Sequence, residues 1–420
     1  MQTVAKIRLR RTLVWAARII VGFTFIISGW AKSIDPWGFL IKVNEYLTVW
    51  GLTVPREAVL TACVGLACVE FCTGAMIAGG SFKRTATWIA AAMMAVMLPL
   101  TVYIAVANPV SDCGCFGDFW VISNGATLAK NIVITALIIY LICVNHTVGG
   151  IYPAPIQWME VTFSLAFPLV IAFIGYHVQP LVDFRPYKIG TRIFDENMTA
   201  DSEKYIYEKD GQEEAFPLDA IPDSTWTFVR VEESGQPAAE RGFEVRDADD
   251  YDVSYEIADE KGPVLMLIVP DPDMAFLARS HYANRLYEYA QTHGVTMIGI
   301  AGAGGETLSK WADLFRPRFP VYSAEDTALK QLVRGDAALV YNDGGIIRWK
   351  RSLNWMDPAI PDRKGPQNAL ADIRPVDDGR IHISIVSVYV ALMLITYLLG
   401  LSPRILRFFV NVTRKATAKK

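Results

Sequence analysis

Cysteine is scarce in this sequence of 420 residues, and it is absent after residue 143. The part of the chain beyond that residue therefore holds no thiol for a disulfide or for catalysis. Histidine is also scarce, with 5 residues, and no cysteine–histidine cluster has the spacing of a zinc site. Thiol chemistry is thus confined to the N-terminal part of the chain, and we expect no metal centre.

Charge is unevenly distributed along the chain. Residues 12–178 and 381–402 are rich in apolar side chains, whereas residues 180–380 have the composition of a soluble domain. That middle part holds 36 of the 43 acidic residues and 23 of the 40 basic ones. An acidic aqueous domain beside a basic membrane part argues against a nucleic-acid partner.

Several apolar runs are long enough to cross a lipid bilayer, which takes roughly 20 residues of helix. The runs are Leu13–Trp30, Val59–Gly79, Thr85–Ala107, Leu128–Cys143, Glu160–His177 and Ile381–Leu401. The first run lacks a small-residue cleavage site, so we expect it to stay in place as a span. The sequence therefore predicts a multi-pass α-helical membrane protein.

Basic residues indicate how these spans are oriented. Clusters lie before the first span, at Lys83 and Arg84, and after the last span. Positive charge is retained on the cytoplasmic side, and with six spans all three clusters fall there together with both termini. We expect a bacterial inner-membrane protein with residues 31–58, 108–127 and 179–380 on the periplasmic side, where disulfides persist.

Two cysteines lie in the outer loop between the third and fourth spans, in the segment Asp112-Cys113-Gly114-Cys115-Phe116-Gly117-Asp118. The two aspartates and two glycines predict a tight turn. One interpretation is a redox-active pair, because a ring closed across one residue is strained and strained disulfides are labile. A second is a structural disulfide, within the pair or to Cys63. A third is a metal site, for which two thiolates are too few.

Charged residues accompany the spans. Lys32 and Asp35 form an interfacial pair or line the outer mouth of the bundle. Glu70 lies deep in the second span, so we expect it to face the bundle interior and to be paired or protonated. It serves either as a structural hydrogen-bond partner, as a proton carrier or as a contact for a bound headgroup. Lys130 either extends to the membrane surface or lowers the pKa of a nearby thiol.

The cysteines inside the spans have two interpretations. Cys68 and Cys72 are one turn apart and share a helix face. They are small packing residues, or together with Cys63 they form a thiol relay to the pair in the loop.

Together these residues resemble the DoxX/MauE-type membrane proteins over residues 12–145. The resemblance rests on Ser28-Gly29 with Lys32 and Asp35-Pro36, Glu70 followed by Gly74, the cysteine segment, and Lys130-Asn131. It implies a four-helix bundle associated with thiol redox, as MauE is linked to disulfide-dependent maturation of methylamine dehydrogenase. The stretch Asp183–Gly190 is similar to the longer Bacteroidetes versions of the family. Quinone-linked disulfide generators have a similar architecture but use a C-x-x-C motif. This chain lacks that motif, which argues against a quinone as cofactor without excluding it.

The soluble part has two regions. Residues 180–260 have short strands, among them Tyr205–Lys209 and Glu213–Phe216. Residues 261–352 alternate strands and helices and end in a hairpin, which resembles a thioredoxin-like fold. Its elements are expected at Val264–Val269, Met274–His293, Val295–Ile300, Thr307–Phe315, Pro320–Tyr322, Asp326–Val333 and Ala338–Lys350. Without cysteine this domain lacks C-x-x-C, so we expect it to dock or cover a partner.

These features predict a four-helix bundle over 12–145, further spans at 158–178 and 381–402, and an extracytoplasmic α/β domain. The expected function is thiol–disulfide exchange with an extracytoplasmic protein through Cys113 and Cys115. The alternative is a non-catalytic assembly or scaffold factor with a structural disulfide and a docking domain. A small-molecule transporter or lipid-binding protein is a third class that six spans permit.

Overall fold

The computed structural model describes residues 2–417 except 109, 111–112, 121, 178, 181, 195–202, 210–211, 217–221, 223–224, 234–242, 259, 261, 273–276, 336 and 374–377. The chain forms two compact units. The membrane unit comprises Met1–Tyr176, Pro180–Phe184 and Asp377–Lys420, and the second unit comprises His177–Gln179 and Arg185–Val376.

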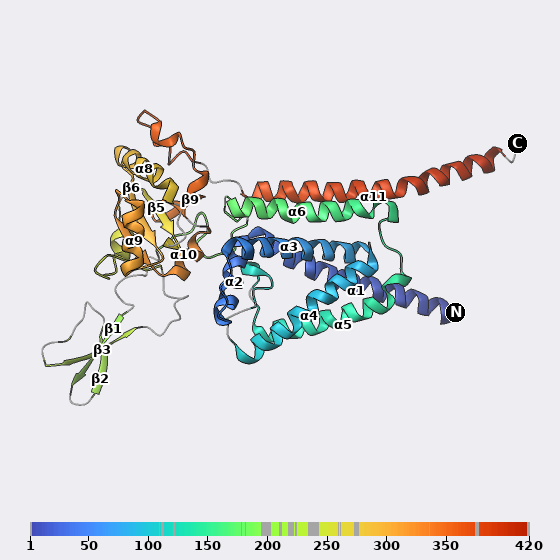
Figure 1. Cartoon of the computed structure of the whole chain (residues 1–420), viewed down its shortest axis with the longest axis horizontal. Coiled ribbons are helices and arrows are strands. Elements are labelled where there is room, and N and C mark those ends of the chain that lie inside the picture. The colour runs from blue at the N-terminus through green and yellow to red at the C-terminus, as the bar shows by residue number, and fades with distance from the viewer. Residues whose placement is uncertain are drawn as a thin grey trace. The chain divides into compact units, whose positions relative to one another are not determined.

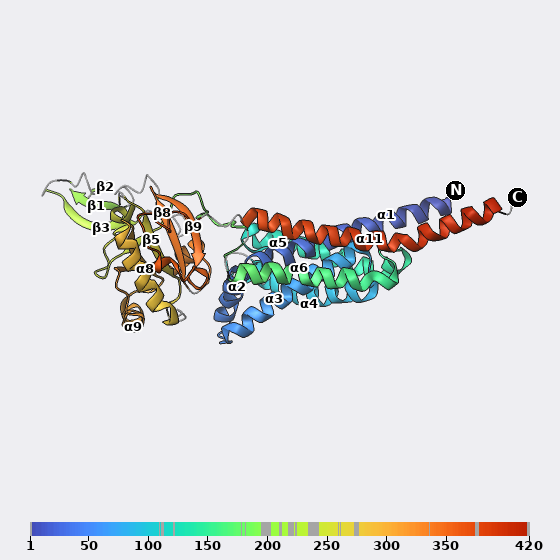
Figure 2. The ribbon, with the colours of Figure 1, turned by 90° about the horizontal axis from the view of Figure 1, so that it is seen from above.

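Long apolar helices build the membrane unit (Figures 1 and 2). Within the described residues, 6 helices are long and apolar enough to cross a membrane, which confirms the six predicted spans. The protein is a multi-pass helical membrane protein. The helices are α1 (Gln2–Ile34), α3 (Arg56–Gly79), α4 (Lys83–Ala107), α5 (Asn124–Val144), α6 (Gln157–His177) and α11 (Asp378–Thr417).

Helices α1 and α3 approach each other closely because glycines lie at their contact. A Cβ atom on Gly29 would lie 2.5 Å from the backbone nitrogen of Phe71, and one on Gly74 would lie 2.6 Å from the carbonyl oxygen of Gly22. Small residues of this kind allow helix backbones to touch inside a membrane. The close approach sets the register of α1 against α3, and with it the position of their polar side chains.

A helix that the sequence did not predict follows α1. Pro36 interrupts the chain as expected, but it opens α2 (Pro36–Val49) rather than a loop. The Asp35 carboxylate accepts a hydrogen bond of 2.8 Å from the backbone N–H of Gly38 and so caps this helix. Lys32 turns into the bundle, where it contacts Glu70, rather than extending to the membrane surface beside Asp35.

Helices α6 and α11 pack together beside the bundle. The rings of Phe167 and Tyr389 have centroids 4.6 Å apart, and the hydroxyl oxygens of Ser164 and Tyr389 are 2.9 Å apart. Phe71 of α3 contacts both rings, with centroid distances of 4.9 and 5.6 Å. The additional pair of helices is thus joined to the bundle through α3.

The second unit contains a mixed sheet with strand order β4-β7-β6-β5-β8-β9. Its strands are β4 (Val245–Arg246), β5 (Val264–Val269), β6 (Thr296–Ala301), β7 (Val321–Ala324), β8 (Ala338–Asp343) and β9 (Ile346–Ser352). β5 pairs in parallel with β6 and antiparallel with β8. All six residues of β5 are buried, as expected for a continuous apolar run in a covered sheet.

Helices cover both faces of this sheet. Leu265 and Leu267 share one core cluster with residues of α8 (Ser280–Thr292) and α9 (Gly305–Phe315). Met266 and Ile268 share the other with α10 (Asp326–Leu332). The alternation follows from the period of two along a strand. The short helix α7 (Ser254–Ala258) precedes β5.

A smaller sheet lies in the predicted β-rich region, with strand order β2-β1-β3. Its strands are β1 (Glu203–Lys209), β2 (Gln212–Phe216) and β3 (Thr227–Glu233). The first two strands confirm the predicted hairpin, whose turn at Asp210 and Gly211 lies outside the described residues. The third strand was not predicted.

Candidate functional site

A buried ion pair joins α1 and α3. Lys32 Nζ lies 2.6 Å from Glu70 Oε2 and 2.7 Å from Glu70 Oε1. Lys32 is 3% exposed and Glu70 is 5% exposed. Glu70 thus faces the bundle interior and is paired, as its depth in the second span predicted.

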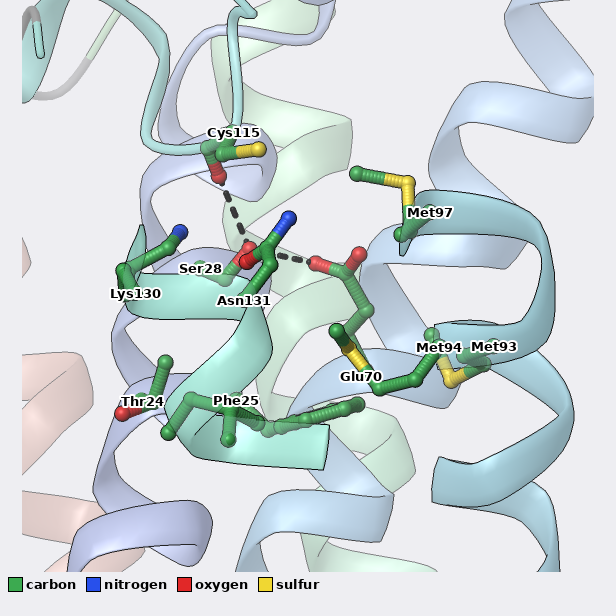
Figure 3. Close-up of a pocket in the computed structure, with 11 residues that line it drawn as sticks. Thr24, Phe25, Ser28, Glu70, Met93, Met94, Met97, Cys115, Lys130 and Asn131 are labelled. Carbon is green, nitrogen blue, oxygen red and sulfur yellow. Dashed lines mark hydrogen bonds between the residues drawn. The ribbon is translucent and has the colours of Figure 1, made fainter. Parts of the chain in front are cut away.

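Ser28 connects this ion pair to the cysteine loop. Its hydroxyl donates to Glu70 Oε2 at 2.8 Å and lies 2.8 Å from the carbonyl oxygen of Cys115. Lys32 Nζ donates to the Ser28 oxygen at 2.9 Å. Ser28 and Lys32 are one helical turn apart, so both reach the same face of α1. Figure 3 shows the chain of contacts from Cys115 through Ser28 to Glu70.

The two loop cysteines lie against each other. Their sulfur atoms are 2.7 Å apart, and both residues are free thiols in this structure. A disulfide bond is about 2.05 Å long, so little sulfur movement separates the dithiol from the disulfide. Gly114 and Gly117 adopt φ angles of +66° and +53°, which glycine tolerates best. These glycines turn the chain so that the two thiol groups point toward each other.

Helix α2 covers the cysteine pair. Tyr46 donates a hydrogen bond of 3.2 Å to the carbonyl oxygen of Cys113. The side chain of Lys42 packs on Gly114, where a Cβ atom would lie 2.5 Å from Lys42 Cγ. Cys113 and Cys115 are only 7% and 9% exposed. A protein thiol can reach either sulfur only after this cover moves.

The charges around the pair favour a thiolate on Cys115. The hydrogen bond from Cys113, followed by the charges of Lys130 and Lys32, lowers the pKa of Cys115 to about 7, against the opposing effect of burial. The same hydrogen bond, together with burial, raises the pKa of Cys113. Lys130 Nζ lies 4.3 Å from the centre of the Phe116 ring, beside the loop. Within the pair, the thiolate is therefore favoured on Cys115 over Cys113.

A cavity of about 40 Å³ lies next to Cys115 and Glu70. It is polar on the side of Ser28, Lys130 and Asn131, and Met93, Met94 and Met97 line it from α4 (Figure 3). This volume has room for a few water molecules. A quinone ring does not fit it in this form, so we derive no step through a quinone.

Residues 10–144 match the family described as methylamine utilisation protein MauE. Helices α1 to α5 of the membrane unit are thus similar to MauE. Residues 203–234, which hold the three-stranded sheet, match a domain of unknown function, DUF8463. No curated protein matches the chain.

The residues similar to MauE contain the ion pair, the cysteine loop and the cavity, all of which lie on α1 to α5. Helices α6 and α11 lie outside the matched residues. Ser28 and Asn131 were noted in the sequence only as parts of the family resemblance. The i,i+4 spacing of Ser28 and Lys32 was the signal for a shared site.

Other predicted residues lie elsewhere. Cys63 packs with Trp37, Leu40 and Val59, in a cluster separate from that of Cys113 and Cys115. No cysteine in the described part of the chain forms a disulfide, so this structure contains no covalent link from Cys63 to the pair.

The cysteines of the predicted relay and the aspartates of the cysteine segment are the remaining predicted residues. Cys72 faces α6, where its thiol lies 3.8 Å from the carbonyl oxygen of Val161, and Cys68 is half-buried. A thiol relay through these residues stays a prediction. Asp112 lies outside the described residues, as does the side chain of Asp118, whose backbone belongs to a short 3-10 helix, Gly117–Phe119.

Proposed function

We propose that this protein is a membrane-bound thiol–disulfide oxidoreductase that exchanges disulfides with a protein on the outer face through Cys113 and Cys115. The observation that carries the proposal is the contact of the two sulfurs at 2.7 Å, beside the buried Lys32–Glu70 pair. The family description, methylamine utilisation, suggests a role in maturation of a redox protein. Because no cysteine follows residue 143, the second unit supplies no thiol, and the partner thiols belong to the membrane helices or to another protein.

One round of exchange needs only the disulfide form of the pair and two thiols of the partner. In the disulfide form of the pair, a partner thiolate attacks Cys113, the Cys113–Cys115 bond breaks, and Cys115 leaves as the thiolate. A second partner thiolate then attacks the partner sulfur of the mixed disulfide and releases Cys113. The partner loses two electrons and two protons, and the pair becomes a dithiol. Cys115 is the better leaving group, because the charges of Lys130 and Lys32 stabilise the departing thiolate.

The buried ion pair positions the loop for this exchange. The Ser28 hydroxyl oxygen lies 2.8 Å from both Glu70 Oε2 and the Cys115 carbonyl oxygen, so the loop is held against the contact between α1 and α3. Lys32 and Lys130 supply the positive charge that stabilises the thiolate. The role of these residues is to hold and polarise the cysteines.

We also propose the bacterial inner membrane as the location, with both termini in the cytoplasm and the cysteine loop outside. Trp30 at the end of α1 donates a hydrogen bond of 3.0 Å to His382 at the start of α11, so these two helices run in opposite directions. The chain termini, Lys83 and Arg84 therefore share one end of the bundle. This distribution supports the cytoplasmic assignment of that end.

The second unit has the role of docking the partner in this proposal. Its strand order, with parallel β5 and β6 followed by the antiparallel pair β8 and β9, supports a thioredoxin-like fold. Fold likeness alone does not define an activity. Since the domain has no cysteine, it acts by binding and leaves the thiol exchange to the membrane loop.

The test is the redox state of the pair in the native membrane. Free thiols are trapped with and without mild reductant, and the state of Cys113 and Cys115 is read by mass spectrometry. We expect both dithiol and disulfide to be recovered, with reductant shifting the ratio. A pair that stays fully oxidised and unexchanging at glutathione-like potentials contradicts the proposal.

A second candidate is an assembly or scaffold factor in which the pair forms a structural disulfide. The cover by α2 favours it, since both cysteines are nearly inaccessible. In that case Cys113→Ser/Cys115→Ser lowers the amount of folded protein. An oxidoreductase instead loses exchange at normal abundance.

A further inference from the structure

A second buried carboxyl lies at the other end of the membrane unit from the cysteines. Glu160, near the start of α6, is 1% exposed. Its Oε2 atom has no hydrogen-bond partner in the described part of the chain. A buried polar group without a partner is rare and calls for an explanation. Glu160 is also outside the residues that match the MauE family.

The end of α3 and the side chain of Tyr152 pack closely against this carboxyl. A Cβ atom on Gly79 would lie 2.3 Å from Glu160 Oε1 and 3.2 Å from the ring of Tyr152. The lack of a side chain at Gly79 therefore lets the carboxyl lie directly against the end of α3. The hydroxyl of Ser81 lies close to the carboxyl, and its Oγ atom likewise has no hydrogen-bond partner in the described part of the chain.

Further polar groups continue from Glu160 along α6. Ser164 is one turn further on the same helix face, and its hydroxyl oxygen lies 2.9 Å from that of Tyr389 on α11. Cys72 of α3 directs its thiol to the carbonyl oxygen of Val161 on the same seam. These groups form a polar line between α3, α6 and α11, which we call the Glu160 seam.

The charge balance favours a neutral acid. Within the described residues no lysine or arginine forms an ion pair with Glu160. The nearby Arg18 is buried against Gly80, and its donors go to Asn145, Val148 and Gly149. A carboxylate buried in a membrane without a cation is costly, so the proton stays on the carboxyl. By contrast, Glu70 has the cation of Lys32 beside it.

We propose that Glu160 is a proton-binding site, which takes up and releases a proton within the Glu160 seam. The group cycles between carboxylic acid and carboxylate, and the proton exchanges with water at the end of the bundle that carries Lys83. Glu70 and Gly79 are nine residues apart on α3, a rise of roughly 14 Å. Helix α3 thus carries a carboxyl paired with Lys32 toward the cysteines and contacts Glu160, which has no such cation, toward the opposite end. This inference does not depend on the proposed thiol exchange.

Infrared difference spectroscopy on the purified full-length protein tests the proposal. Spectra are recorded at about pH 6 and about pH 9, because the raised pKa values of buried carboxyl groups in proteins fall in this range. We expect a protonated-carboxyl C=O band at the lower pH that is lost at the higher pH and shifts in D₂O. The band is absent from Glu160→Gln and retained in Glu70→Gln. Glu160→Gln keeps the shape of the neutral acid, so its thermal unfolding is expected to match that of the native protein.

Two results overturn the proposal. If the band is missing from the native protein, the carboxyl is ionised. If the band is present but insensitive to pH and to D₂O, the proton is sealed in and Glu160 is a structural group. Labelling with dicyclohexylcarbodiimide, which reacts with protonated carboxyls in apolar surroundings, gives an independent readout. We expect modification of Glu160 at the lower pH, and no modification there contradicts the proposal.

Discussion

Lys32 and Glu70 form an ion pair of 2.6 Å that is almost completely buried between α1 and α3. The residues are far apart in sequence, and only the close packing of the two helices brings them together. The pair is joined through Ser28 to the loop that carries the cysteines. Its integrity therefore affects both the stability of the bundle and the position of the thiols.

Removing one partner leaves a buried charge without compensation. We predict that Lys32→Met lowers the free energy of unfolding by about 3–5 kcal/mol, and that Lys32→Met/Glu70→Met recovers most of this loss. Denaturation of the detergent-solubilised protein measures both. The exposed pair Lys310–Glu306 is the control, for which Lys310→Met is expected to change stability by less than about 1 kcal/mol. Equal stability of the native protein and Lys32→Met contradicts the prediction.

The lowered pKa of Cys115 predicts the pH dependence of its reactivity. A pKa of about 7 means that the thiolate is populated above that pH and lost below it. In the reduced protein, alkylation of Cys115 by a small reagent is expected to rise with a midpoint near neutrality. Lys130→Gln removes a positive charge and Cys113→Ala removes the hydrogen bond, so both move the midpoint upward. A midpoint that is unchanged in both variants shows that neither interaction acts on the thiol.

The packing of α2 over the cysteine pair leads to a separate prediction about the accessibility of the two thiols. Tyr46→Phe removes the hydrogen bond to the Cys113 carbonyl, and a net hydrogen bond contributes about 1 kcal/mol. If alkylation requires α2 to move, the rate is expected to rise about fivefold. Tyr103→Phe, at a half-exposed position on α4, is the matched control and is expected to leave the rate unchanged. An unchanged rate in Tyr46→Phe indicates that the reagent reaches the pair by another path.

The glycines between α1 and α3 predict a steric effect. A methyl group at Gly29 meets the backbone of α3 rather than a flexible side chain. Gly29→Ala is therefore expected to lower stability by about 1–3 kcal/mol, as for other overpacked sites. Gly65→Ala on α3 has open space around it and is the control. If both alanine variants unfold alike, the helices are able to separate without loss.

The sequence predicted the elements whose signal is local. Six apolar runs predicted the spans, and the run Val264–Val269 predicted the central strand of the second unit without error. Helix α2 was missed because its short segment mixes apolar and polar residues and follows a proline. The depth of Glu70 predicted burial and pairing. Its partner was not predictable, because the contact with Lys32 depends on the packing register of α1 and α3.

The most direct test of the central claim is mixed-disulfide trapping on cells that produce Cys115→Ala. In this variant the Cys113 thiolate attacks a disulfide of the partner and displaces one partner thiolate, the reverse direction of the exchange. No Cys115 thiol is left to release the mixed disulfide, so the account predicts a covalent complex of Cys113 with a partner protein that dissolves in reductant. Cys143→Ala keeps the pair and serves as the control without a trapped complex. If Cys115→Ala is present at normal abundance and forms no reductant-sensitive complex, thiol exchange through this pair is contradicted.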